Sequence, residues 1–205
     1  MHILLPLLPV FQILGQILGL LAPIEGLTQP EVEAALHGQV PVRIQPFARP
    51  DGKTAGRGIG AITIDRPVSE VWTTLIRFED KAEYMPRIKS AEVLDKSPER
   101  LRVRMVVDAS VTTARYTMIY QLDEPAHRLS WKLDHSVSDN TIAEADGEYR
   151  VYELAPGRTL VTYNSQVDTG RALPRFIQNY IARRSIPDLL RAVKKRVETS
   201  GLWRR

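Results

Sequence analysis

Alternating apolar and polar positions mark three successive strands in the middle of the chain. Apolar residues take the odd positions of LRVRMVVDA (101–109), the even positions of ARYTMIYQL (114–122) and the odd positions of RLSWKLDHS (128–136). Polar residues such as Arg102 and Lys132 take the opposite positions. Because side chains alternate across a sheet, the pattern predicts antiparallel strands with one covered and one solvated face. The turn sequences KSPER and DEPAH separate the three runs, as expected for hairpins.

Further strands are expected on both sides of this block. Residues 59–64 and 90–95 precede it, whereas residues 143–154 and 159–168 follow it and are joined by the turn sequence APGR. The stretch 40–58 contains several prolines and glycines. It predicts a strand or two followed by a loose connection into the main domain.

Three short segments and one long segment have helical spacing instead. Residues 27–38 predict a short helix with Thr28 as its N-cap and Gly38 as its stop. After the first strand of the main domain, Pro67 suits the first turn of a helix whose apolar residues recur at helical spacing. Another short helix follows and is broken at Pro86.

The long segment is RALPRFIQNYIARRSIPDLLRAVKKRVE, residues 171–198. Its apolar residues form two stripes: Leu173, Phe176, Ile177, Tyr180 and Ile181, then Ile186, Leu189, Leu190, Val193 and Val197. Pro187 lies in the middle of the segment, where it removes one helical hydrogen bond and predicts a kink. A kinked helix with an apolar face can follow and cover a curved sheet.

The order of these elements predicts the fold class. Strands and helices do not alternate after residue 92, which argues against a parallel, doubly wound sheet. We expect an α+β fold in which a curved antiparallel sheet of about six to seven strands grips a long, kinked C-terminal helix, with two short helices after the first strand. The expected divisions are an N-terminal segment (1–26), a short helix with a linker or extra strand (27–57), the main domain (58–199) and a basic tail (200–205).

The N-terminal segment is apolar. It carries no formal charge before Glu25. The mostly apolar run of residues 3–24 is long enough to cross a bilayer as a helix, which needs ~20 residues. A secretory signal peptide and an uncleaved membrane anchor are the two leading interpretations, and a peripheral buried helix is a third. No basic residue precedes the apolar run and no A-x-A site follows it, so the interpretations stay open. The first two predict an exported protein, periplasmic or extracellular, or a membrane-anchored one.

The residue totals exclude some chemistry. The chain has no Cys, which rules out disulfides, thiolate metal sites and cysteine nucleophiles. Hydrophobic residues make up 43% of the chain, enough to bury a sizeable core. The sequence also contains no HExxH motif, no Gly-rich phosphate loop and no Ser-His-Asp order. No metal or cofactor is therefore expected.

The net charge of +4 is concentrated at the C-terminal end. Residues 171–205 contain ten Lys/Arg and two Asp/Glu, a balance of +8, which leaves −4 for the rest of the chain. Arg191, Lys194, Lys195 and Arg196 are expected on the solvated face of the long helix. The simplest interpretation is a wet helix face, and the second is a contact with an anionic membrane surface. No nucleic acid partner is expected.

Two stretches resemble a known family. The first is ITIDRPVSEVWTTLIRFEDKAEYMPRIKSAEVL, with a Y-x-P-like turn at Tyr84, Met85 and Pro86, and the second is GRALPRFIQNYIARRSIPDLLRAVKKRV. In this order they resemble the START-like, or helix-grip, superfamily (SRPBCC), and within it the polyketide cyclase/dehydrase and coenzyme-Q-binding START-like group. The resemblance covers about residues 58–197. It implies a sheet that grips the long helix, with a cavity between them for an apolar ligand.

The covered face supplies the candidate ligand-binding residues. These are Met105, Tyr116, Met118, Tyr120, Trp131, Leu133, Tyr149, Val161 and Tyr163, closed by Phe176, Ile177 and Tyr180. They are mostly apolar and aromatic, as in many ligand pockets, although the same side chains could simply fill a core.

Three functions stay open, because one fold can host several. The first is binding, transport or chaperoning of a hydrophobic small molecule such as a lipid, a quinone or a polyketide. The second is a cyclase- or dehydratase-like enzyme that uses the same cavity. His135 is then the only candidate base, because its position in the alternation predicts the covered face. The third is an interaction module that works through the basic helix.

Overall fold

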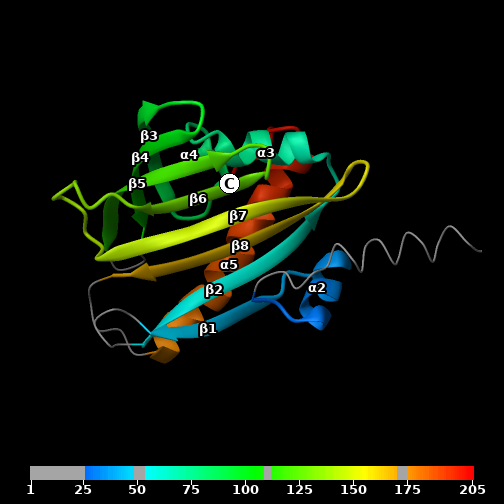
Figure 1. The fold of residues 1–205 in the computed structure, drawn as a ribbon, viewed down its shortest axis with the longest axis horizontal. Helices are drawn as coiled ribbons and strands as arrows, with labels where there is room; N and C mark the ends of the chain where they lie inside the picture. Colours follow the sequence, from blue (N-terminus) through cyan, green and yellow to red (C-terminus); the bar gives the residue numbers. More distant parts are fainter. Residues whose placement is uncertain (1–25, 49–53, 109–111, 170–174) are drawn as a thin grey trace, which may run out of the picture.

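The computed structural model describes residues 26–48, 54–108, 112–169 and 175–205 (Figure 1). The predicted signal or anchor segment lies outside them, apart from its last residue. Within the described residues, no helix combines the length and apolar character needed to cross a membrane.

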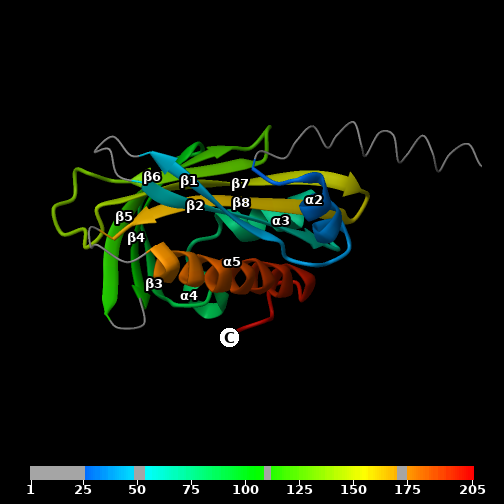
Figure 2. The same ribbon diagram turned by 90° about the horizontal axis from the view of Figure 1, so that it is seen from below.

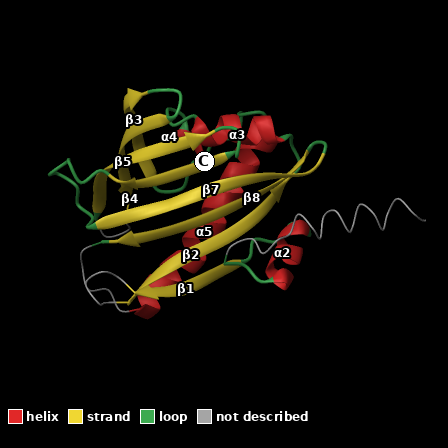
Figure 3. Cartoon of the chain, viewed as in Figure 1, coloured by secondary structure: helices red, strands yellow, loops and turns green. Residues whose placement is uncertain are grey.

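The strands form one eight-stranded antiparallel sheet in the order β1-β2-β8-β7-β6-β5-β4-β3 (Figure 3). The strands are β1 (Val42–Ala48), β2 (Thr54–Ile64), β3 (Ile88–Lys96), β4 (Arg100–Asp108), β5 (Thr113–Asp123), β6 (Arg128–Leu133), β7 (Glu144–Ala155) and β8 (Arg158–Asp168). The prediction of an antiparallel sheet is confirmed, but its count of six to seven strands was low. The difference lies in β1 and the first half of β2, where prolines and glycines obscure the alternation.

Four helices accompany the sheet in the described residues: α2 (Gln29–Leu36), α3 (Val68–Ile76), α4 (Lys81–Tyr84) and α5 (Arg175–Glu198). The sheet curls around α5, which lies along its concave face (Figure 2). Ile186, Leu190 and Val193 of α5 are buried in the main core, which confirms the second apolar stripe. The helix continues through Pro187, and the predicted kink there stays a prediction.

Helix α2 covers part of the opposite, outer face of the sheet. Its Val32 and Ala35 form a second, smaller core with Ile59 of β2 and Leu160 of β8. The hydroxyl of Thr63 donates a hydrogen bond to the carbonyl oxygen of Ala35 at 2.8 Å. At β2 the sheet is therefore covered on both faces, by α5 on the concave side and by α2 on the outer side. The prediction of one solvated face does not hold for this strand.

The ends of α2 follow the sequence prediction. Thr28 is the N-cap, and its backbone N–H donates to the Glu31 carboxylate at 2.7 Å. Gly38 follows the C-cap residue with a φ of +80°, a conformation that glycine adopts without a steric penalty. Thr28 and Gly38 thus mark the start and stop that their residue types predict.

Gly60 lets α5 approach β2 closely. A Cβ atom at this position would lie 2.7 Å from Cγ2 of Ile186 and 3.2 Å from Cδ1 of Leu190. We expect Gly60→Ala to lower the free energy of unfolding by about 1 kcal/mol, because the core must shift to admit the methyl group. Urea unfolding measures the loss. In an Ile186→Ala background the loss should shrink, and an unchanged loss would contradict the proposed contact.

Candidate functional site

The concave face carries the predicted ligand-binding side chains. Nine of the twelve predicted residues have described side chains, and all nine pack in or against the main core: Met105, Tyr116, Met118, Tyr120, Trp131, Leu133, Tyr149, Val161 and Tyr163. The side chains of the other three, Phe176, Ile177 and Tyr180, lie outside the described residues. Tyr116, Trp131 and Tyr163 are only half-buried, whereas the other six are buried.

The strand register brings these residues together in pairs. Met105 of β4 lies directly opposite Tyr116 of β5, and Tyr120 of β5 lies opposite Trp131 of β6. Tyr149 of β7 likewise lies opposite Tyr163 of β8. Directly opposite side chains on one face interact with each other. The alternation alone predicted that these residues share a face. The antiparallel pairing of the strands determines which of them lie directly opposite each other.

The aromatic rings form a chain across the face. The ring centroids of Tyr120 and Trp131 are 6.0 Å apart, those of Trp131 and Tyr149 are 5.4 Å apart, and those of Tyr149 and Tyr163 are 5.0 Å apart. Phe78, which lies between α3 and α4, extends the chain, with its ring 4.3 Å from that of Tyr120. Phe78 was not among the predicted site residues, because it lies in a connection without periodicity. The only available signal was a lone aromatic residue among charged neighbours.

Gly147 is a second residue that the sequence analysis missed. It lies opposite Trp131 in the register, and a Cβ atom there would come within 2.5 Å of Cζ2 of the indole. The same atom would lie 2.3 Å from the backbone oxygen of Asn164. The sequence does carry a signal for this contact, because a glycine inside a strand often marks a close approach.

The tyrosine hydroxyls of the concave face remain neutral, and three of the four have no hydrogen-bond partner among the described residues. Desolvation raises the pKa of Tyr116, Tyr120, Tyr149 and Tyr163. Among the described residues, none hydrogen-bonds to the hydroxyls of Tyr116, Tyr120 and Tyr149. These three phenol groups are therefore unpaired although they lie on a covered face.

The covered position predicted for His135 is wrong. Strand β6 ends at Leu133, and the Asp134 carboxylate accepts hydrogen bonds from the backbone N–H and the hydroxyl of Ser136 at 3.0 and 2.6 Å. This local turn ends the alternation before His135, whose side chain is 65% exposed and lies 3.1 Å from the Glu144 carboxylate. The observation that made His135 a candidate base no longer applies.

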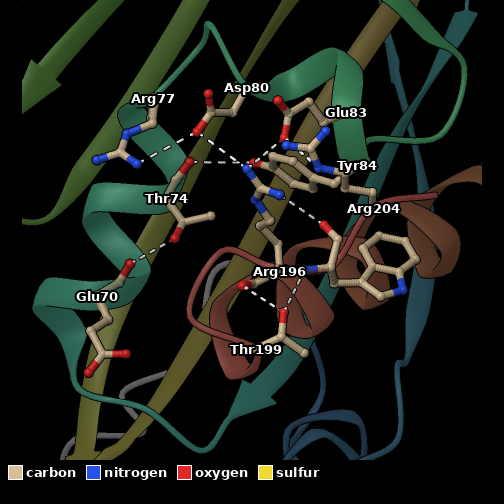
Figure 4. A network of polar contacts seen from close by, with 10 residues as sticks. Glu70, Thr74, Arg77, Asp80, Glu83, Tyr84, Arg196, Thr199 and Arg204 are labelled. Atoms are coloured by element: carbon tan, nitrogen blue, oxygen red, sulfur yellow. Dashed lines mark hydrogen bonds and ion pairs between the residues drawn. The ribbon is translucent and has the colours of Figure 1, made fainter.

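The solvated position predicted for Arg196 is also wrong (Figure 4). Arg196 is buried, and its guanidinium donates to Glu83 and to the backbone oxygen of Trp203, each at 2.9 Å. Lys194 is half-buried and donates to the backbone oxygen of Thr63 at 2.8 Å. These two cations hold the end of α5 in place. Of the four residues predicted on the wet face, Arg191 and Lys195 are exposed, and the membrane contact stays a prediction for them.

The described residues offer no cluster of acidic or histidine side chains that could hold a metal ion. The described side chains of the concave face carry aromatic rings, aliphatic groups and neutral hydroxyls.

This fold and this face define a START-like, helix-grip protein. Solved structures with the same fold include the Zhui aromatase/cyclase from Streptomyces sp. R1128, at 18% identity and a TM-score of 0.60 over 77% of this chain and 94% of that one. The sequence model of the family described as polyketide cyclase / dehydrase and lipid transport matches residues 64–194, and the chain belongs to this family. No curated protein matches the chain in sequence.

Two lipid transfer proteins share the fold as well. Human StAR-related lipid transfer protein 5 has 11% identity and a TM-score of 0.65 over 93% of this chain and 95% of that one. A STAR-related lipid transfer protein from Xanthomonas axonopodis has 12% identity and a TM-score of 0.66 over 78% of this chain and 93% of that one. At such identities, the likeness shows a common fold and leaves the ligand to be argued from the site.

Proposed function

We propose that the protein binds an uncharged hydrophobic molecule between the concave face of the sheet and α5. One observation carries this proposal: the hydroxyls of Tyr116, Tyr120 and Tyr149 lie on a covered, aromatic face and have no hydrogen-bond partner among the described residues. A face that only filled a core would pair such groups. The family description and the lipid transfer proteins of the same fold support the proposal.

The electrostatics of the face favour a neutral ligand with oxygen atoms. Met118, Leu133 and Val161, which lie among the tyrosines, carry no charge, so a charged ligand group would lose its hydration without gaining a counter-ion. Desolvation raises the pKa of Tyr120 and Tyr149 well above the ordinary value, so both hydroxyls keep their protons and can donate to a ligand oxygen.

A cyclase- or dehydratase-like activity is the second candidate. The same protonated hydroxyls could donate to a ligand carbonyl and stabilise negative charge that develops on its oxygen during a reaction. The name of the Zhui aromatase/cyclase supports this alternative, which uses the same face. Turnover of a polyketide-type substrate by purified protein would favour the enzyme, whereas an unchanged bound molecule would favour the carrier.

We expect Tyr149→Phe to weaken the binding of a neutral dye with a carbonyl group, such as Nile red, by roughly twofold to tenfold. The substitution removes one hydrogen-bond donor, and such a bond contributes about 0.5–1.5 kcal/mol. Dye fluorescence measures binding. Tyr152→Phe on the same strand is the matched control, because Tyr152 packs on the outer face of the sheet against the second core. The dye affinity of this variant should equal that of the native protein.

Failure of the native protein to bind the dye would count against the proposed function. Equal dye affinities of the two variants would instead show that the Tyr149 hydroxyl does not contribute to binding. Native mass spectrometry of protein purified from its own host adds an independent test, because a carrier should retain a small hydrophobic molecule.

A further inference from the structure

Lys81 holds its amine in an aromatic pocket between α3 and α4. The residue is only 4% exposed, and its Nζ atom lies 5.1 Å from the ring centroid of Phe78 and 5.9 Å from that of Tyr84. Nζ donates one hydrogen bond, at 2.8 Å, to the backbone oxygen of Leu75, and no carboxylate among the described residues forms an ion pair with it. The Tyr84 hydroxyl stays neutral, because burial raises its pKa. An ammonium group has three N–H donors, so its charge is poorly solvated here and the pocket favours the neutral amine.

The charged groups that the described structure places around this pocket pair with one another. Asp80 and Glu83 lie 3.4 and 2.9 Å from the guanidinium of Arg196, which comes from α5 (Figure 4). Arg77, at the end of α3, lies 3.6 Å from Asp80. Burial lowers the pKa of Lys81 to about 7, although the charge of Asp80 acts in the opposite direction. Lys81 therefore gains or loses its proton close to neutral pH.

Phe78 connects this pocket to the concave face. Its ring, which lies beside Nζ of Lys81, is 4.3 Å from the ring of Tyr120, one of the candidate ligand-binding residues. Phe78 is 2% exposed and belongs to the main core, so its position depends on both neighbours. The hydrogen bond from Lys81 to Leu75 also joins α4 to the end of α3 across the connection that carries Phe78. Displacing Lys81 therefore disturbs the ring that supports Tyr120.

We propose that Lys81 is a pH-sensitive element of the binding site, and that the concave face releases its ligand when Lys81 takes up a proton. The inference rests on the proposed function and adds a regulation of that site. A protonated Lys81 regains hydration by leaving the aromatic pocket, and its long, flexible side chain allows the ammonium group to reach solvent. Phe78 then loses the group that packs against it and no longer holds Tyr120 in place. The neutral form keeps the two rings in the arrangement that the structure shows.

Binding of Nile red at pH 6 and pH 8 tests this coupling, because the dye is uncharged at both values. With a pKa of about 7, roughly one tenth of the protein has a neutral Lys81 at pH 6 and roughly nine tenths at pH 8. If only the neutral form binds, the affinity falls by about tenfold, and residual binding by the protonated form makes the change smaller. We therefore expect roughly threefold to tenfold weaker binding at pH 6, as measured by dye fluorescence. Circular dichroism verifies that the protein is folded at both pH values.

Lys81→Met should bind the dye with the same affinity at both pH values. Methionine is apolar and flexible, so it fills the pocket without a titratable group. Lys96→Met is the matched control, because Lys96 is exposed at the end of β3, and this variant should keep the native pH dependence. A pH dependence that persists in Lys81→Met would assign it to another group, such as a histidine, and overturn the proposal.

Two outcomes in the native protein separate the inference from the function on which it rests. Equal dye affinity at pH 6 and pH 8 would overturn the inference and leave ligand binding intact, whereas no binding at pH 8 would overturn the proposed function. Calorimetry at pH 7 in two buffers with different enthalpies of ionisation adds a measurement that needs no variant. The native protein should release roughly a third to a half of a proton on binding the dye. The absence of proton release would contradict the coupling even if Lys81→Met fails to fold.

Discussion

Replacing Arg196 by Gln is expected to lower the free energy of unfolding by about 3 kcal/mol, as measured by urea denaturation. The guanidinium bonds to Glu83 and to the Trp203 backbone, lies 3.4 Å from the Asp80 carboxylate, and covers the Tyr84 ring at 5.3 Å. Gln cannot make these contacts together. The expected loss is at the lower end for a broken buried ion pair, because the Asp80 and Glu83 side chains are 29% and 34% exposed and stay partly hydrated.

Arg191→Gln is the matched control for this substitution. Arg191 is on the same helix, but its side chain is exposed and its ion pair with Asp188 is long, at 3.7 Å. An exposed pair of this kind contributes about 0–0.5 kcal/mol. Equal losses in the two variants would show that the buried network does not hold the end of α5.

The stability of the protein is expected to rise by about 2 kcal/mol between pH 7 and pH 9 because of Lys81. Lys81 is buried, with 4% of its surface exposed, and its ammonium group donates to the Leu75 carbonyl at 2.8 Å. Burial lowers its pKa to about 7, and nearby Asp80 only partly offsets this. In the unfolded chain the pKa is about 10.4. Between these values the unfolded chain binds a proton that the folded chain lacks, so raising the pH favours folding.

Lys81→Met should remove this slope, as measured by urea unfolding at several pH values. The test belongs below pH 9.5, because the raised pKa values of Tyr84 and of the concave-face tyrosines reduce stability once unfolded tyrosines ionise near pH 10. The lowered pKa values of Glu31 and Asp134 change the free energy of unfolding only at acidic pH, so they do not contribute to this slope. A slope that remains in Lys81→Met would assign the effect to another group.

The sequence predicted which side of each strand is covered, but not where each strand ends. Alternation placed Leu133 correctly, because burial of one face requires it. The same alternation failed two residues later at His135, because the Asp134 side chain forms a local turn that competes with the strand. A period-two pattern contains no information about such competition.

Burial of charged residues could not be predicted from local patterns either. Arg196 was assigned to the solvated face because isolated cations are rarely buried. Its partner Glu83 lies 113 residues earlier, so the ion pair exists only once the whole sheet has brought α4 beside α5. Trp131 and Gly147 show the same limit, because each strand could be recognised alone, but their contact depends on the register between strands.

The pairing of β2 with β8 has a consequence for synthesis of the chain. β2 pairs with β1 on one side, but its other neighbour, β8, follows roughly 100 residues later, which takes roughly 5–20 seconds on a ribosome. During that time Ile59, Ile62 and Ile64, all buried in the finished protein, lie on a strand with an unpaired edge. Such an edge is a template for aggregation. We therefore expect a nascent chain of this protein to be more prone to aggregation than the finished protein.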